Sequence, residues 1–117
     1  MTIFTRSLGR SGIQVSAMGM GCWAIGGPFW KNGQPVGWGN VDDDESIRSI
    51  QRALDLGITF FDTANHYPDF VNCGLSESII GRWFAQGGGR REKIVLATKV
   101  YGTMGDGANE RGLSAYH

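Results

Sequence analysis

Three ionisable side chains stand where a parallel α/β fold would carry out chemistry. Asp62 closes the apolar run 58–62, and Tyr67 follows it by five residues. Lys99 closes a second apolar run, 94–99. Each run is typical of a buried parallel strand, and active sites of such folds lie at the carboxyl ends of the strands. A phenol beside an ammonium ion and a carboxylate gives up its proton more readily than a free phenol, so the pattern predicts a proton donor.

Each of these residues also has an ordinary structural interpretation. Asp62 alone fits a strand-end cap, Lys99 alone fits a surface lysine, and Tyr67 alone fits a residue that packs on a loop. Together, at two adjacent strand ends, they favour the catalytic interpretation.

The composition is that of a small globular protein without a charge bias. The chain has 117 residues, 41% of them hydrophobic and 19% charged, which suffices for one domain with its own core. Eleven basic residues balance eleven acidic ones, so no long-range field attracts nucleic acid or an anionic membrane. No apolar run approaches the ~20 residues of a membrane span, and the polar start is no signal peptide. We therefore expect a cytoplasmic protein.

A β-hairpin and a short strand are predicted at the start of the chain. Residues 3–8 and 13–15 flank a glycine-containing turn, which is the pattern of a short hairpin. Residues 17–21 continue as a strand of small residues, whose glycines indicate that backbone or a ligand approaches closely. Residues 24–41 are expected to form a long loop.

Two amphipathic helices are predicted between the strands. Asp42 has the side chain to cap the first helix, Glu45 completes a capping-box pattern, and Gly57 ends the helix. The second helix spans 76–85, and the strand 93–99 follows it. The residues expected on the inner helix faces are Ile47, Ile50, Leu54, Ile79, Ile80, Trp83 and Phe84. This β–α–β–α–β order is typical of a (β/α) barrel or a doubly wound sheet.

Two glycine-rich patterns do not qualify as nucleotide sites. Residues 19–24 match the loose G-x-G-x-x-A pattern of dinucleotide folds, but the helix that this pattern requires begins only near Asp42. Residues 87–91 lack the Lys-Ser or Lys-Thr of a P-loop and follow a helix, where glycine acts as a terminator. The Rossmann interpretation is rejected.

No metal site or disulfide is predicted. Neither His66 nor His117 has another His or Cys at metal-ligand spacing, and Cys22 and Cys73 lie in dissimilar contexts. His66 lies on the predicted site loop, where it faces either the substrate or solvent. No chemistry is assigned to His117, which we place away from any strand end.

The end of the chain predicts that more sequence follows. Gly112 and Ser114 set up a helix start with Ser114 as the N-cap, three residues before the chain stops. A helix start without its helix is expected of a fragment of a longer protein.

Six segments together resemble the aldo-keto reductases, in that family's order and over nearly the whole chain. They are residues 8–12, 19–23, 53–58, 61–67, 76–81 and 97–99. Residues 110–114 resemble the branch that includes potassium-channel beta subunits and many bacterial reductases. The resemblance implies that residues 1–117 are the N-terminal part of a single (β/α)8 barrel domain, with its hairpin and about three βα units.

The resemblance also implies reversible reduction of a small aldehyde or ketone, with NADPH as the hydride donor. Tyr67 would be the proton donor, Lys99 the cation that acidifies it, and Asp62 the partner of Lys99. The residues implied to meet the cofactor are Gly21, Cys22, Trp23 and Asp62. Most of the cofactor site, and the family's fourth catalytic residue, would lie beyond residue 117.

Two alternatives to a carbonyl reductase stay open. One is a non-catalytic binding or regulatory protein on the same scaffold, and the other is an inactive truncated product. Retention of Asp62, Tyr67 and Lys99 favours the enzyme. The loop 68–74 is longer than the family's usual Tyr-Gly-x-Gly pattern, so the resemblance implies no particular substrate shape.

Overall fold

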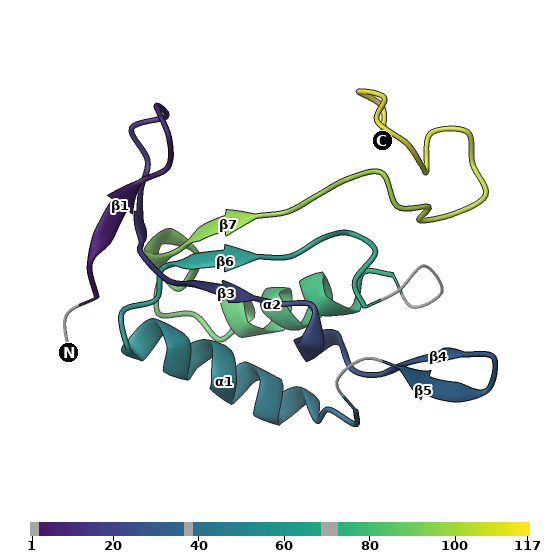
Figure 1. The fold of residues 1–117 in the computed structure, drawn as a ribbon, viewed down its shortest axis with the longest axis horizontal. Helices are drawn as coiled ribbons and strands as arrows, with labels where there is room; N and C mark the ends of the chain where they lie inside the picture. The colour runs from purple at the N-terminus through teal and green to yellow at the C-terminus, as the bar shows by residue number, and fades with distance from the viewer. Residues whose placement is uncertain (1–2, 37–38, 69–72) are drawn as a thin grey trace.

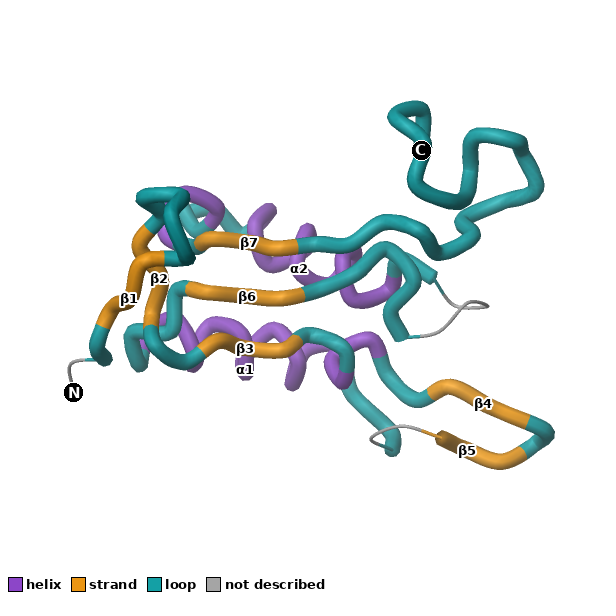
Figure 2. Tube along the Cα trace, turned by 45° about the horizontal axis from the view of Figure 1, so that its top comes forward, coloured by secondary structure: helices purple, strands orange, loops and turns teal. Residues whose placement is uncertain are grey.

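The centre of the fold is a parallel sheet with two helices on one of its faces (Figures 1 and 2). The structure, a computed structural model, describes residues 3–36, 39–68 and 73–117. The strands, in spatial order, are β3 (Gly19–Gly21), β6 (Phe60–Asp62) and β7 (Val95–Ala97), and the helices are α1 (Asp43–Asp55) and α2 (Leu75–Ala85). Both strand pairs are parallel, so the predicted α/β class and the β–α–β–α–β order are confirmed.

The core lies between the sheet and the two helices. Ile50 of α1, Phe61 of β6 and Trp83 of α2 are completely buried. The rings of Phe61 and Trp83 stack with their centroids 6.0 Å apart. Ile79 and Ile80 are each 2% exposed, and the partly buried members of the predicted faces are Ile47, Leu54 and Phe84. The predicted inner faces of both helices are therefore confirmed.

The start of α1 is capped by Asp42 as predicted, but only one of the two hydrogen bonds of a capping box is formed. Asp42 accepts a hydrogen bond from the Glu45 amide at 2.9 Å. The Glu45 carboxylate accepts from Arg48 at 3.0 Å instead of from the Asp42 amide. Gly57 follows the helix with φ 92°, a left-handed conformation that glycine adopts without strain.

The predicted N-terminal hairpin is present and lies at the amino end of the sheet (Figure 1). It consists of β1 (Thr5–Ser7) paired antiparallel with β2 (Gln14–Ser16). Ser16 joins the hairpin to the sheet, because its hydroxyl accepts from the Thr59 amide at 2.9 Å and its amide donates to the Thr59 hydroxyl at 3.1 Å. The opposite, carboxyl end of the sheet is left free for a site.

The prediction of a long loop over residues 24–41 is wrong. This segment contains a 3-10 helix, Ala24–Gly26, and an antiparallel hairpin of β4 (Phe29–Lys31) and β5 (Gln34–Val36). Asn32 and Gly33 form its turn with φ 52° and 74°. Asn-Gly is the commonest sequence of such a two-residue hairpin turn, so the signal was present in the sequence. Residues 37–38 of the predicted loop lie outside the described residues.

The strands are shorter than predicted, and the predicted helix start near the end forms only one turn. The predicted strands 17–21, 58–62 and 93–99 pair regularly only over three residues each. Residue 93 belongs to a second 3-10 helix, Arg91–Lys93. At Ser114 the carbonyl accepts from the His117 amide at 3.2 Å.

No helix of the described residues covers one face of the sheet, because α1 and α2 both lie on the other face (Figures 1 and 2). Successive strand residues point to opposite faces, so Phe60 and Val95 face away from the core that contains Phe61 and Leu96. We call this side the open face. Within the described residues, β3 and β7 are also the sheet's unpaired edges.

We expect a polypeptide of residues 1–117, made alone, to self-associate. An open apolar face and two unpaired edges favour intermolecular pairing over a stable monomer. Sedimentation velocity at micromolar concentration should show oligomers, and the thermal transition should be broad. A monomer that unfolds in one cooperative transition would contradict this expectation.

Candidate active site

The carboxyl ends of the three parallel strands meet at one edge of the sheet. Asp62, the last residue of β6, lies opposite Gly21 on one side and Ala97 on the other. The pairing continues past the regular strands, where the Asn65 amide donates to the Lys99 carbonyl at 3.1 Å. This register brings the predicted residues of the second and third strand ends next to each other.

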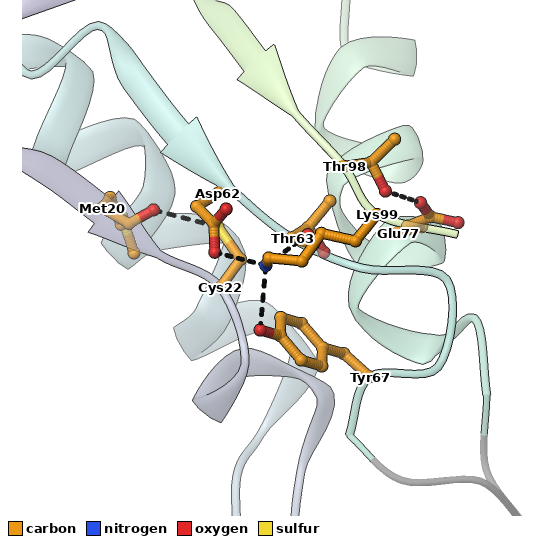
Figure 3. A network of polar contacts seen from close by, with 8 residues as sticks. All are labelled: Met20, Cys22, Asp62, Thr63, Tyr67, Glu77, Thr98 and Lys99. Carbon is orange, nitrogen blue, oxygen red and sulfur yellow. Dashed lines mark hydrogen bonds and ion pairs between the residues drawn. The ribbon is translucent and has the colours of Figure 1, made fainter. Parts of the chain in front are cut away.

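The Lys99 ammonium group forms the centre of the site (Figure 3). It donates to Asp62 Oδ2 at 2.7 Å, to the Tyr67 hydroxyl at 3.0 Å and to the Thr63 carbonyl at 3.0 Å. An ammonium group has three N–H donors, and all three are used here. The structure thus brings Asp62, Tyr67 and Lys99 into one hydrogen-bonded cluster, with the side chains of Lys99 and Asp62 still 47% and 45% exposed.

The surroundings of Lys99 favour its charged form. Partial burial lowers the pKa of Lys99, but the hydrogen bonds to Asp62 and Tyr67 and the charge of Asp62 raise it by more. The pKa of Lys99 is therefore above its ordinary value of 10.5. The Lys99 ammonium therefore places a positive charge and a hydrogen-bond donor 3.0 Å from the Tyr67 hydroxyl oxygen.

The loop that carries Tyr67 is held by aromatic neighbours. Trp23 donates from its indole nitrogen to the Pro68 carbonyl at 2.8 Å, and its ring centroid lies 6.5 Å from that of Tyr67. The His66 ring packs edge-on against Tyr67 with centroids 5.3 Å apart. A Cβ atom at Gly102 would lie only 2.5 Å from His66 Cβ, so glycine lets the two loops meet. His66 is therefore a packed, half-buried residue.

Residues 21–23, implied by the resemblance to meet a cofactor, differ in accessibility. Gly21 is exposed, and a Cβ atom there would meet nothing within 4 Å. Trp23 is 38% exposed, whereas Cys22 is completely buried in the core. The predicted close approach is found instead at Gly19, where a Cβ atom would lie 3.3 Å from the Phe60 side chain and carbonyl oxygen.

Cys22 lies in the core beneath the candidate site and hydrogen-bonds the backbone there. Its amide donates to the Asp62 carbonyl at 2.8 Å, and its thiol donates to the Met20 carbonyl at 3.6 Å (Figure 3). Burial, with a smaller contribution from the Asp62 charge, raises the pKa of the Cys22 thiol to about 12. The thiol therefore stays protonated at neutral pH. The Cys22 backbone amide holds the end of β6 through its hydrogen bond to the Asp62 carbonyl.

The sequence did not indicate three contacts around the site. The Thr63 carbonyl binds Lys99, and Thr98 donates to Glu77 on α2 at 2.5 Å. Asn65 meets His117, whose Nε2 lies 3.2 Å from the Asn65 amide nitrogen. The prediction that His117 lies away from any strand end is thus wrong, since the segment after β7 folds back on the loop after β6.

Neither a metal site nor a membrane span is found in the described part of the chain. No group of three or more His, Cys, Asp or Glu side chains within it could hold a metal ion. None of its helices is long and apolar enough to cross a bilayer.

The fold and the site define an α/β protein with a tyrosine, a lysine and an aspartate joined at the carboxyl edge of a parallel sheet. The Aldo/keto reductase family model matches residues 17–116. The chain belongs to the aldo/keto reductase family, which confirms the resemblance seen in its motifs.

Two curated relatives come from Bacillus subtilis (strain 168). The chain is 50% identical over 115 residues to "Uncharacterized oxidoreductase YrpG", covering 93% of this chain and 31% of that protein. It is 41% identical over 94 residues to "Aldo-keto reductase YhdN", covering 80% of this chain and 24% of that protein. The chain therefore spans less than a third of the length of either relative.

Two solved structures are similar to this chain. One is the aldo-keto reductase AKR11C1 of Bacillus halodurans in its holo form, with a TM-score of 0.64, 33% identity, and coverage of 86% of this chain and 26% of that one. The other is the thermostable aldo-keto reductase Tm1743 in complex with the inhibitor epalrestat, with a TM-score of 0.60, 28% identity, and coverage of 85% and 31%. Both structural neighbours are thus aldo-keto reductases.

Proposed function

We propose that residues 1–117 form the N-terminal part of a single (β/α)8 barrel that reduces aldehydes or ketones to alcohols with NADPH. Family membership over residues 17–116 and the fraction of each relative's length that the chain spans support this proposal. The parallel order β3–β6–β7 and the hairpin at the amino end of the sheet also fit such a barrel. The open face would become the barrel interior, which is packed with side chains.

The observation that carries the proposed activity is the bond from the Lys99 ammonium to the Tyr67 hydroxyl, at 3.0 Å. Tyr67 gives its proton to the carbonyl oxygen, so the phenol O–H bond breaks as the alcohol O–H bond forms. Lys99 stabilises the phenolate that remains, and Asp62 holds Lys99 in place from 2.7 Å. When bound, NADPH supplies the hydride that the carbonyl carbon accepts.

The residues at the strand ends fit a flat cofactor ring. Gly21 leaves open space above the end of β3, next to Asp62 in the neighbouring strand. We propose that Gly21, Trp23 and Asp62 border the nicotinamide and the carbonyl substrate, because each has exposed surface at this edge. Cys22 would support them through its backbone, since its side chain lies in the core.

The proposal is tested in a complete barrel that contains residues 1–117. One route joins these residues to the part of YrpG that follows its matched region, with unaltered YrpG as the folding control. We expect consumption of NADPH that depends on added aldehyde. A folded barrel that binds NADPH but reduces no member of an aldehyde and ketone panel would favour the non-catalytic scaffold.

Residues 1–117 alone should not bind NADPH at micromolar concentration. The proposed contacts reach only the nicotinamide end, and the Lys99 ammonium is already paired with Asp62. The phosphate and adenine groups would need residues from elsewhere in the barrel. Fluorescence titration of NADPH should show binding by the complete barrel and none by the isolated residues, and micromolar affinity of the isolated residues would contradict this.

A further inference from the structure

The first turn of α2 contacts the segments that carry both Tyr67 and Lys99. The Ser76 amide donates to the Tyr67 carbonyl at 3.4 Å. The next residue, Glu77, accepts a hydrogen bond from the Thr98 hydroxyl at 2.5 Å (Figure 3). Two consecutive residues of one helix therefore bind the backbone of the proposed proton donor and the residue directly before the lysine.

The alternation of side chains at the end of β7 makes this arrangement possible. Successive residues of an extended segment point to opposite sides, so Thr98 faces α2 when Lys99 faces the open face. Figure 3 shows the Thr98 side chain directed toward Glu77 and the Lys99 side chain directed toward Tyr67. A bond at Thr98 thus fixes the backbone from which the lysine side chain extends.

We propose that Glu77 and Thr98 are positioning residues for Lys99, an inference that rests on the proposed reductase function. A hydrogen bond from a hydroxyl to a carboxylate is among the stronger kinds in proteins. It anchors the backbone end of Lys99, while Asp62, Thr63 and Tyr67 hold the ammonium end. Glu77 and Thr98 do not touch the reacting atoms, so they act on the reaction only through Lys99.

A purely local role for Glu77 leads to different expectations. A carboxylate in the first turn of a helix is stabilising through the helix dipole alone. In that case substitutions of Thr98 would leave catalysis unchanged. Substitutions of Glu77 would lower the stability of the fold and nothing else. The positioning role instead predicts that removal of either partner lowers the rate of the chemical step.

The test compares Thr98→Val with Thr98→Ser in the complete barrel. Valine keeps the shape but removes the hydroxyl, whereas serine keeps the hydroxyl. We expect Thr98→Val to lower kcat about tenfold with unchanged KM for NADPH, because small displacements of catalytic groups slow the chemical step. Thr98→Ser should stay within about twofold of the parent, and Glu77→Ala should behave like Thr98→Val, on the same grounds.

Three results would overturn the inference. The first is an unchanged kcat in Thr98→Val. The second is an equal decrease of kcat in Thr98→Ser. The third is a decrease of kcat in Thr98→Val that is explained by a lower thermal midpoint of unfolding. Tyr67→Phe in the same barrel separates the two proposals. If the parent barrel is inactive and turns over no faster than Tyr67→Phe, the result counts against the reductase function and not against the positioning role of Glu77 and Thr98.

A second measurement decides the positioning role without activity. An ammonium group held by three hydrogen bonds should give a resolved proton–nitrogen NMR signal for Lys99 in the parent barrel. The signal should persist in Thr98→Ser and broaden in Thr98→Val and Glu77→Ala, with Lys99→Met assigning it. An identical Lys99 signal in all of these positioning variants would reject the inference, whatever the enzyme activity.

Discussion

A complete barrel that carries Tyr67→Phe should reduce carbonyl compounds at least about 10²-fold more slowly than the parent. The change removes one oxygen and keeps the ring, so the contacts with Trp23 and His66 can persist. Without the hydroxyl, the oxygen of the developing alcohol loses its proton donor, while the Lys99 ammonium keeps Asp62 and the Thr63 carbonyl as acceptors. Binding of NADPH should be unchanged.

Single-turnover hydride transfer to an activated aldehyde is the appropriate measurement for Tyr67→Phe. It reports on the chemical step and is insensitive to product release. Tyr116→Phe is the matched control, because this tyrosine is 83% exposed and is not a member of the cluster of Asp62, Tyr67 and Lys99. A rate for Tyr67→Phe within about threefold of the parent would show that Tyr67 is not the proton donor.

Lys99→Met should also lower turnover by about 10²-fold, with little change in NADPH affinity. Methionine keeps much of the side-chain length but offers no donor to Tyr67, so a phenolate formed at Tyr67 in the reaction would lose its neighbouring positive charge. Asp62 loses its ion-pair partner, yet its side chain is 45% exposed and remains hydrated. The substitution should therefore affect catalysis more than folding.

The pH dependence provides a second readout for Lys99. Because the pKa of Lys99 in the folded protein is raised above its ordinary value of 10.5, the ammonium form predominates throughout the neutral range and is lost only as the pH rises through the raised pKa. The parent should thus show no loss of activity from Lys99 deprotonation in the neutral range. Lys93→Met, at an exposed lysine, is the control. Parent-like turnover in Lys99→Met would remove this residue from the mechanism.

Local sequence patterns were sufficient to locate the main members of the candidate site. An apolar run that ends in a charged residue is typical of a parallel strand that delivers a side chain to the carboxyl edge. This pattern predicted Asp62 at the end of β6 and Lys99 near the end of the adjacent strand β7, two residues past its last residue, Ala97. The helix boundaries were predicted equally well, since Asp42 and Gly57 act through the local backbone. The Asn32–Gly33 turn shows that one readable local signal was overlooked.

The sequence by itself determined which residues carry charge at the strand ends and which family the chain resembles. Only the tertiary structure decided how those residues are held. The Thr63 carbonyl that binds Lys99 belongs to the backbone, which has no residue-type signature. The Thr98–Glu77 bond joins residues 21 positions apart, and the burial of Cys22 depends on how the sheet and helices pack. Such features arise from contacts between distant segments, which no local spacing encodes.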